Sequence, residues 1–342
     1  MTGPAWVVGG GGLLGSHMRR AFLQHGRELR TWDCPVGPFD WRDGRRLLEQ
    51  IDASVDLFVD RIHALGRPWS VLWCAGVGIV GADPSVLEVE RTAFERLLDR
   101  LARARSAAGS DVPGVVFLAS SAGAVYGDCP DQPITEASEP RPISPYGRHK
   151  LAMERHLLGW ASERPSIAPL VGRISNLYGV GQNASKPQGL ISHMSRSIIL
   201  NNNINLYMSL DTMRDYLHAG DCASAVADLI DHLVRTAGSC GTSPGAVKIF
   251  ASERTASIAQ ILGIFASLTR FRPRYLCHSS PSAALQPRCL RFRSNVLRDV
   301  STARLMALPI GIKLVHQKNV SDFLCGRLRP SLARHSGRQV SP

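Results

Sequence analysis

The chain has 342 residues, enough for about two domains of ordinary size. Its hydrophobic content of 44% is typical of a globular protein with a sizeable core, and no apolar run reaches the roughly 18 residues needed to cross a bilayer. The net charge of +12 prompts a nucleic-acid hypothesis, but the excess is mostly arginine late in the chain, with no interleaved aromatic residues to stack on bases. We therefore expect neither a nucleic-acid partner nor a membrane partner.

The amino-terminal segment and the cysteines indicate a cellular compartment. The segment has no basic start and no small-residue cleavage site, so no signal peptide is predicted and we expect a cytoplasmic protein. The eight cysteines form no C-x-x-C pair and have no zinc-like spacing. We expect free thiols and no metal site.

The first predicted unit is a strand, a glycine turn and a helix. The apolar run Ala5–Val8 precedes Gly9, Gly12 and Gly15, which have G-x-x-G-x-x-G spacing, and an amphipathic run over 18–25 follows. Glycines at this spacing let the backbone approach a pyrophosphate, whose charge the helix N-terminus stabilises. The pattern predicts a dinucleotide site, with a simple tight connection as the alternative.

The second predicted strand, over 28–33, ends in an acid. Asp33 lies 18 residues after Gly15, near the spacing at which a carboxylate receives the hydroxyls of the adenosine ribose. Because a carboxylate would repel a 2′-phosphate, this position favours NAD over NADP. An ordinary turn aspartate is the alternative. Only six residues separate Asp33 from Asp40, so the second α/β unit is too short for a normal helix.

Further strands and helices alternate along the chain. We predict a strand over 69–74, a long helix over 85–107 and a strand over 114–119 that leads into Ser120 and Ser121. This alternation favours a parallel, doubly wound sheet, in which ligands bind at the carboxyl ends of the strands. The two serine hydroxyls are therefore well placed for a ligand.

A helix start at Ser144 carries the main candidate for chemistry. Ser144 can cap the helix, Pro145 suits its first turn, and Tyr146 and Lys150 then lie on one face. A nearby ammonium favours the phenolate, so we expect Lys150 to lower the pKa of Tyr146 and make it a general base near neutral pH. The alternative is an exposed helix start that happens to contain both residues.

Together these motifs resemble the extended short-chain dehydrogenase/reductases, and more narrowly the NAD-dependent nucleotide-sugar epimerase/dehydratase branch. The resemblance rests on the glycine turn, Asp33, the Asp-Trp-Arg-Asp run over 40–43, the Val-Tyr-Gly run over 125–127 and the Tyr146/Lys150 pair. The segments over 172–179, 188–191 and 213–218 also match. It implies an α/β protein with a Rossmann-like doubly wound parallel sheet and a smaller mixed α/β substrate-binding domain.

The resemblance also implies a tightly bound NAD. The glycine turn would hold the pyrophosphate, Asp33 the adenosine ribose, and Asp40 and Trp41 would flank the adenine, while Lys150 would contact the nicotinamide ribose. The implied NAD contacts are Gly9, Gly12, Leu13, Leu14, Gly15, Asp33, Asp40, Trp41, Cys74, Ala75, Gly76, Ser120, Tyr146 and Lys150.

For catalysis, the resemblance implies that Tyr146 takes the proton from the C4 hydroxyl of a UDP-sugar. The family's usual Ser or Thr is Ala122 here, so Ser121 is the predicted catalytic hydroxyl beside Tyr146 and Lys150, with Ser120 as the alternative. Two more departures are Glu90, where the family usually has Asn, and Arg291, where an acid is common. The implied substrate contacts are Ser121, Ala122, Tyr146, Arg173, Ser175, Asn176, Gln188, Gly189, Leu190, Arg214 and Arg288.

The branch contains several reactions that begin with oxidation at C4. A 4,6-dehydratase or a decarboxylase needs additional acid or base groups near the strand-end serines, and Ala122, Gly123 and Ala124 cannot transfer protons. We therefore predict a 4-epimerase that works through a transient 4-keto sugar. Within the family, Ser175 favours UDP-glucuronic acid slightly over UDP-glucose. A dehydratase or decarboxylase and a non-catalytic NAD sensor are the alternatives.

The expected domain organisation follows the same resemblance. Residues 1–173 and about 210–238 would form the NAD-binding domain, and about 174–209 with 239–326 the nucleotide-sugar domain. We expect the basic tail over 327–342 to be disordered. Family members usually pair through two long helices, here about 85–107 and 145–162, which predicts a homodimer.

Overall fold

The computed structural model describes residues 3–24, 38–76, 82–182, 189–240, 245–278, 287–301 and 305–328. The predicted strand over 28–33, with Asp33, and the predicted substrate residue Gln188 lie outside the described residues.

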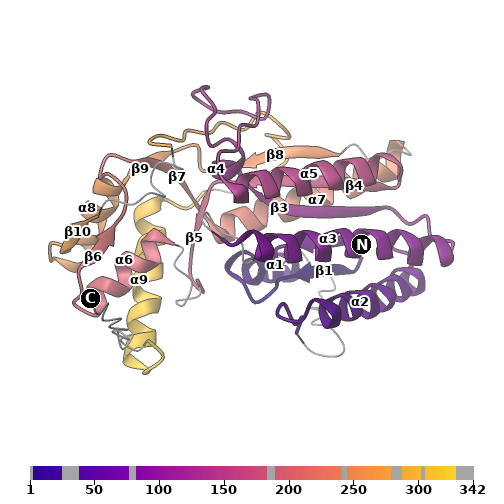
Figure 1. The fold of residues 1–342 in the computed structure, drawn as a ribbon, viewed down its shortest axis with the longest axis horizontal. Coiled ribbons are helices and arrows are strands. Elements are labelled where there is room, and N and C mark those ends of the chain that lie inside the picture. Colours follow the sequence, from indigo (N-terminus) through magenta and orange to yellow (C-terminus); the bar gives the residue numbers. More distant parts are fainter. Residues whose placement is uncertain are drawn as a thin grey trace, which may run out of the picture.

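Among the described residues, five parallel strands form the sheet of the larger part of the molecule, on the right of Figure 1. Its strands are buried along almost their whole length, which is expected of a parallel sheet covered on both faces. In spatial order they are β1 (Ala5–Val8), β2 (Trp69–Trp73), β3 (Gly114–Ser121), β4 (Ile167–Ile174) and β8 (Ala246–Phe250).

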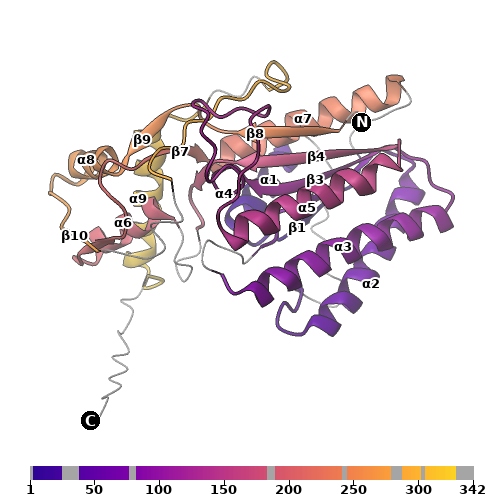
Figure 2. The ribbon, with the colours of Figure 1, turned by 45° about the horizontal axis from the view of Figure 1, so that its top comes forward.

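Helices cover both faces of this sheet, as Figures 1 and 2 show. Helices α1 (Leu13–Gln24) and α7 (Ala219–Cys240) pack together on one face, and α2 (Gly44–Leu65), α3 (Pro84–Ala107) and α5 (Pro145–Ser162) cover the other. Alternate side chains of each strand enter the two apolar cores because successive residues point to opposite faces. This arrangement confirms the predicted doubly wound α/β fold.

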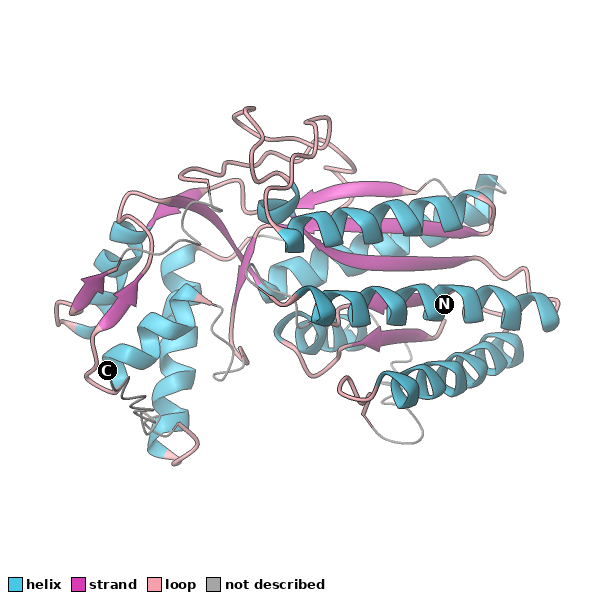
Figure 3. Ribbon diagram, viewed as in Figure 1, coloured by secondary structure: helices cyan, strands magenta, loops and turns pink. Residues whose placement is uncertain are grey.

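The described residues of the smaller part of the molecule form two short sheets and three helices, on the left of Figure 3. Its own apolar core is built around buried side chains such as Met194, Ile261, Phe265 and Ile312. One sheet has the order β5 (Asn176–Tyr178), β7 (Met213–His218), β9 (Thr255–Ser257), and β6 (Ile204–Leu206) pairs with β10 (Tyr275–Cys277). The helices are α6 (Leu190–Ile199), α8 (Ile258–Thr269) and α9 (Leu308–Leu324).

The chain crosses between the two parts several times, and one crossing differs from the expected boundaries. Residues 239–326 were expected in the smaller domain, but β8 pairs in parallel with β4 and completes the main sheet. Pairing between strands so far apart in the chain leaves no local signal in the sequence, so nothing within 239–326 indicates that β8 belongs to the main sheet. None of the described helices is long and apolar enough to span a membrane.

Candidate active site

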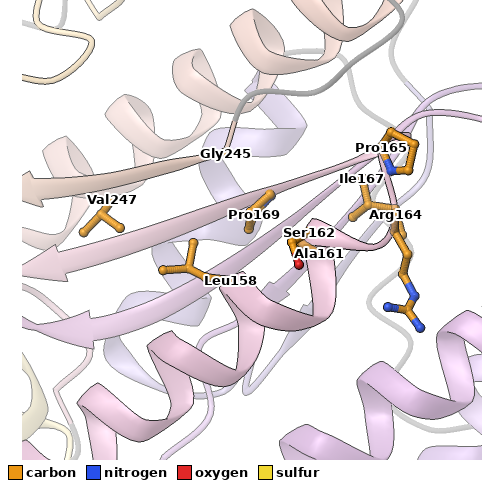
Figure 4. Close-up of a pocket in the computed structure, with 9 residues that line it drawn as sticks. All are labelled: Leu158, Ala161, Ser162, Arg164, Pro165, Ile167, Pro169, Gly245 and Val247. Carbon is orange, nitrogen blue, oxygen red and sulfur yellow. The ribbon is translucent and has the colours of Figure 1, made fainter.

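A cavity of about 1140 Å³ lies at the carboxyl ends of the main-sheet strands, where the smaller part of the molecule meets them. A second hollow of about 360 Å³, between the end of α5 and the first residues of β4 (Figure 4), is lined mainly by apolar side chains such as Leu158, Ile167 and Val247. The larger cavity contains the predicted chemical groups and is the candidate active site.

The glycine turn builds one end of the large cavity. The Gly12 N–H donates to the Gly9 carbonyl over 3.0 Å, and a Cβ on Gly15 would lie only 2.2 Å from that oxygen. Gly9 has φ of +84°, which glycine adopts without strain. The N-terminus of α1 follows, and Leu13 and Leu14 line the cavity. Free backbone N–H groups at a helix start suit a pyrophosphate, so this turn fits the phosphates of NAD.

Substitution of Gly15 tests this fit. In Gly15→Ala the new methyl group would displace the turn, and we expect NAD affinity to fall by roughly tenfold or more, the equivalent of about 1.4 kcal/mol. Calorimetric titration with NAD measures the change. Gly159→Ala in α5 is the matched control, because a Cβ there would meet nothing within 4 Å. Equal affinities in Gly15→Ala and the parent protein would contradict the assignment.

The start of α5 places Tyr146 and Lys150 in the cavity wall. The Ser144 hydroxyl accepts from the Gly147 N–H over 3.0 Å, which confirms the predicted helix cap. A Cβ on Gly147 would lie 2.2 Å from the Ala124 carbonyl, so glycine lets this helix start pack closely on the turn after β3. The Lys150 Nζ lies 5.8 Å from the centre of the Tyr146 ring, and both residues line the cavity.

The electrostatic environment of Tyr146 differs from the predicted one. Burial raises the pKa of the Tyr146 phenol, Lys150 lowers it, and the Glu90 carboxylate raises it again, so that the pKa lies above its ordinary value. Lys150 therefore acts on the pKa of Tyr146 in the predicted direction, but burial and Glu90 outweigh its effect. The spacing of Tyr146 and Lys150 indicated the attraction correctly but gave no indication of the burial or of the second charge.

The two candidate serines have different surroundings, although both line the cavity. The Ser120 hydroxyl donates to the Glu154 carboxylate, which also accepts from Arg173 over 2.7 Å. Arg173 in turn donates to the Tyr126 hydroxyl. Ser121 stands at the N-cap of α4 (Ala122–Val125) and makes no side-chain capping bond. Ser121 therefore fits the predicted role of a substrate-facing hydroxyl better than Ser120.

The structure does not bring two of the predicted substrate residues to the cavity. Arg173 is buried in its ion pair with Glu154, because the sheet face from which it projects is covered by α5. Ala122 is fully buried in a small apolar cluster with Tyr126 and Leu290. Neither side chain is therefore available to a substrate in the cavity.

Arg214 brings a positive charge into the cavity. It is 7% exposed and lines the cavity, and one guanidinium nitrogen donates to the Met213 carbonyl over 2.9 Å. Its Nη2 is buried and has no hydrogen-bond partner among the described residues. Burial lowers the pKa of this guanidinium, which would be stabilised by an anion. Arg214 therefore fits the predicted contact with a diphosphate.

Ser175 lines the cavity but its proton is already engaged. The hydroxyl donates to Asp215 Oδ1 over 2.7 Å, and the same oxygen accepts from the Ser252 N–H over 2.8 Å. The other carboxylate oxygen accepts from the Ser252 hydroxyl and the Arg254 N–H. With four donors directed at it, Asp215 acts as an acceptor, and Ser175 can only accept a further hydrogen bond from a ligand.

The remaining predicted residues divide into two groups. Cys74, Ala75, Gly76, Asn176, Gly189 and Leu190 line the cavity. Arg288 is exposed and paired with Asp211, and Trp41 packs edge-on against Trp73 with ring centres 6.1 Å apart. The side chain of Asp40 accepts from the Arg42 N–H. The roles of Arg288, Asp40 and Trp41 stay predictions.

Several lining residues had no signal in the sequence. Tyr207, at the end of β6, lines the cavity and stacks on His278 with ring centres 5.3 Å apart. His193 also lines it, and so does Tyr216, which unlike the other two lies in the matching segment over 213–218. An isolated aromatic residue or histidine in the second half of the chain carries no motif that would indicate this position. Among the described residues that line the cavity there is no Asp or Glu, and no group suited to a metal ion occurs in the described parts of the chain.

Comparisons with known proteins agree with this geometry. Over 244 residues the chain is 25% identical to UDP-glucose 4-epimerase of Lactobacillus helveticus, covering 67% of this chain and 72% of that protein. The structure of MoeE5 in complex with UDP-glucuronic acid and NAD is similar with a TM-score of 0.72 at 24% identity, covering 94% of this chain and 100% of that one. The NAD-dependent NDP-hexosamine 5,6-dehydratase TunA gives a TM-score of 0.68 at 18% identity, covering 94% and 98%.

A family model for the NAD dependent epimerase/dehydratase family matches residues 5–239. The match covers the glycine turn, the strand-end serines, the Tyr146/Lys150 pair and Arg214. The chain belongs to the NAD-dependent epimerase/dehydratase family.

Proposed function

We propose that this protein interconverts the C4 epimers of a UDP-sugar, with Tyr146 as the base. One observation carries the proposal: the glycine turn, the Tyr146/Lys150 pair and Arg214, whose Nη2 has no hydrogen-bond partner among the described residues, all line a single cavity. A dinucleotide, the C4 hydroxyl of a sugar and the diphosphate that stays attached to that sugar can therefore be held together there. The similarity of this chain to a UDP-glucose 4-epimerase and to the epimerase/dehydratase family supports the same class of reaction.

Each residue has a defined task in this proposal. Bound NAD supplies the capacity to accept hydrogen from C4 and to return it. Tyr146 removes the proton from the C4 hydroxyl, and Ser121 holds that hydroxyl by a hydrogen bond. Lys150 stabilises the phenolate and orients the nicotinamide ribose, while Arg214 binds the diphosphate of the substrate. The 4-keto sugar turns over in the cavity before it is reduced on the opposite face.

The lining of the cavity favours epimerisation over dehydration or decarboxylation. A 4,6-dehydratase must protonate a leaving group at C6 and remove a proton at C5, and these tasks need acid and base groups beyond Tyr146. Gly123 and Ala124 line the wall beside Ser121, and the described lining residues include no carboxylate. A 4-epimerase needs no further proton-transfer group.

The environment of Ser175 bears on the sugar. A C6 carboxylate only accepts hydrogen bonds, but the Ser175 proton is donated to Asp215, so Ser175 cannot donate to a carboxylate without losing that bond. A neutral C6 hydroxyl can instead donate to Ser175. This removes the reason for preferring UDP-glucuronic acid, and we propose a neutral UDP-hexose of the UDP-glucose type.

The choice of sugar can be tested with a panel of substrates. Purified protein is incubated with UDP-glucose, UDP-glucuronic acid and their N-acetylated relatives, and the products are identified by NMR. We expect inversion at C4 of the neutral sugar at least about tenfold faster than that of the uronic acid, the equivalent of about 1.4 kcal/mol in the barrier. Faster inversion of UDP-glucuronic acid would contradict the argument from Ser175.

We also propose a cytoplasmic homodimer that pairs through α3 and α5. The two helices lie side by side on the molecular surface in Figure 2, and their outward residues include Glu88, Arg148 and Arg155. These opposite charges could pair across a two-fold axis. Light scattering on the eluting protein measures the mass, and a monomer at micromolar concentration would contradict this proposal.

A further inference from the structure

A buried carboxylate contacts Lys150 of the Tyr146/Lys150 pair. Glu90, in α3, is 1% exposed, and its Oε1 lies 2.7 Å from the Lys150 Nζ. Its Oε2 is buried with no hydrogen-bond partner among the described residues. A Cβ on Gly76 would lie 3.2 Å from Oε2, so the carboxylate reaches the end of β2, where Gly76 lines the cavity. Sequence comparison alone indicated only that Glu90 replaces an asparagine.

Glu90 and Lys150 stabilise each other's charged form. Burial alone would raise the pKa of Glu90, but the charge and hydrogen bond of Lys150, with a contribution from His149, lower it to about 2. Burial would likewise lower the pKa of Lys150, but Glu90 and Tyr146 raise it on balance. Both groups are therefore charged at neutral pH.

The other titratable groups around this pair come from the elements packed against it. The His149 Nε2 lies 3.8 Å from the same Glu90 oxygen, and Glu154 acts on Lys150 from the next turn of α5. Cys74, after β2, is held as a neutral thiol because burial raises its pKa. Glu88, on the exposed side of α3, is paired with Arg91. Glu90 is thus the carboxylate that contacts the ammonium directly.

We propose that Glu90 is a positioning residue. It orients the Lys150 ammonium and offsets the positive charge that Lys150 presents to Tyr146. Glu90 accepts a hydrogen bond from one of the three N–H groups of the Lys150 ammonium, which leaves the other two free to donate into the cavity. Ionisation of Tyr146 then changes the Glu–Lys–Tyr group, of which Glu90 and Lys150 are buried, from neutral to a net charge of −1. Without the Glu90 charge, the same ionisation would give a neutral Lys–Tyr pair, which burial disfavours less. The inference rests on the proposed role of Tyr146 as the base.

This inference can be tested by titrating Tyr146 directly. The ultraviolet absorbance of tyrosinate is followed against pH in the parent protein and in Glu90→Gln, and subtraction of the same titration in Tyr146→Phe removes the other five tyrosines. We expect the Tyr146 titration in Glu90→Gln to move to lower pH by about one unit or more. The pH profile of turnover should move in the same direction.

Two further variants separate charge from packing. Glu90→Asp retains the carboxylate and should titrate within about half a unit of the parent protein, whereas Asp99→Asn changes an exposed carboxylate on the same helix and should have no effect. The inference fails if Glu90→Gln titrates at the parent pH or higher, or if Glu90→Asp moves as far as Glu90→Gln. It also fails if Tyr146 ionises in neither protein before unfolding.

The titration and the turnover assay distinguish the two proposals. A shifted titration in a protein that inverts no UDP-sugar would support the role of Glu90 and contradict the proposed reaction. Inversion of a UDP-sugar together with an unshifted titration would support the proposed reaction and contradict the role of Glu90.

Discussion

Replacing Tyr146 with phenylalanine should lower the rate of C4 inversion by roughly 10²–10⁴-fold, the usual contribution of a positioned acid or base. The ring would still fill its place beside Lys150, so we expect NAD binding to be retained. Initial rates from NMR time courses give the loss of turnover, and the absorbance of retained NAD gives the occupancy.

A matched substitution makes this result specific. Tyr275→Phe removes the same hydroxyl from an exposed residue of β10 and should leave the rate unchanged. Wild-type turnover in Tyr146→Phe would contradict the role of Tyr146 as the base. If the parent protein itself shows no turnover on any UDP-sugar while it binds NAD, the proposed function fails and a non-catalytic NAD sensor becomes the better account.

Replacing Glu154 with leucine should lower the free energy of unfolding by about 3–5 kcal/mol, the usual effect of removing one partner of a buried ion pair. Arg173 would keep its charge in an apolar environment, since its side chain is only 8% exposed. The Ser120 hydroxyl would lose its acceptor at the same time. Urea unfolding, with the midpoint and slope fitted together, measures the change.

A double variant shows whether the loss comes from the unpaired charge. Glu154→Leu combined with Arg173→Met removes both charges, and we expect it to recover most of the lost stability. Glu163→Gln, at the exposed end of the same helix, should change the stability by less than about 0.5 kcal/mol. A loss below about 1 kcal/mol in Glu154→Leu would show that the ion pair contributes little.

The features that could be predicted from sequence are those fixed by local geometry. The glycine turn depends on close approaches within residues 9–15, and the α5 start depends on Ser144 and Gly147, three residues apart. The fold class followed from the alternation of apolar strands and amphipathic helices. These patterns needed no knowledge of distant contacts.

The features that could not be predicted depend on contacts between distant segments. Lys150 and Glu90 are 60 residues apart in the chain, and Arg173 meets Tyr126 across 47 residues. The resemblance implied a substrate contact for Arg173, in the matching segment over 172–179, but the pleat of β4 directs its side chain into the interior beneath α5. The direction of the Tyr146 pKa shift similarly depends on burial, which the spacing of two residues does not report.

The most direct test of the central claim is the fate of hydrogen during turnover in heavy water. The protein is incubated with UDP-glucose in D₂O, and the products are followed by ¹H NMR. The proposed epimerisation returns the original hydrogen to C4 within the cavity, so we expect a C4-inverted mixture with no deuterium on carbon. Deuterium at C5, with a 4-keto-6-deoxy product, would contradict the account, because it requires proton transfers for which the described cavity walls provide no carboxylate.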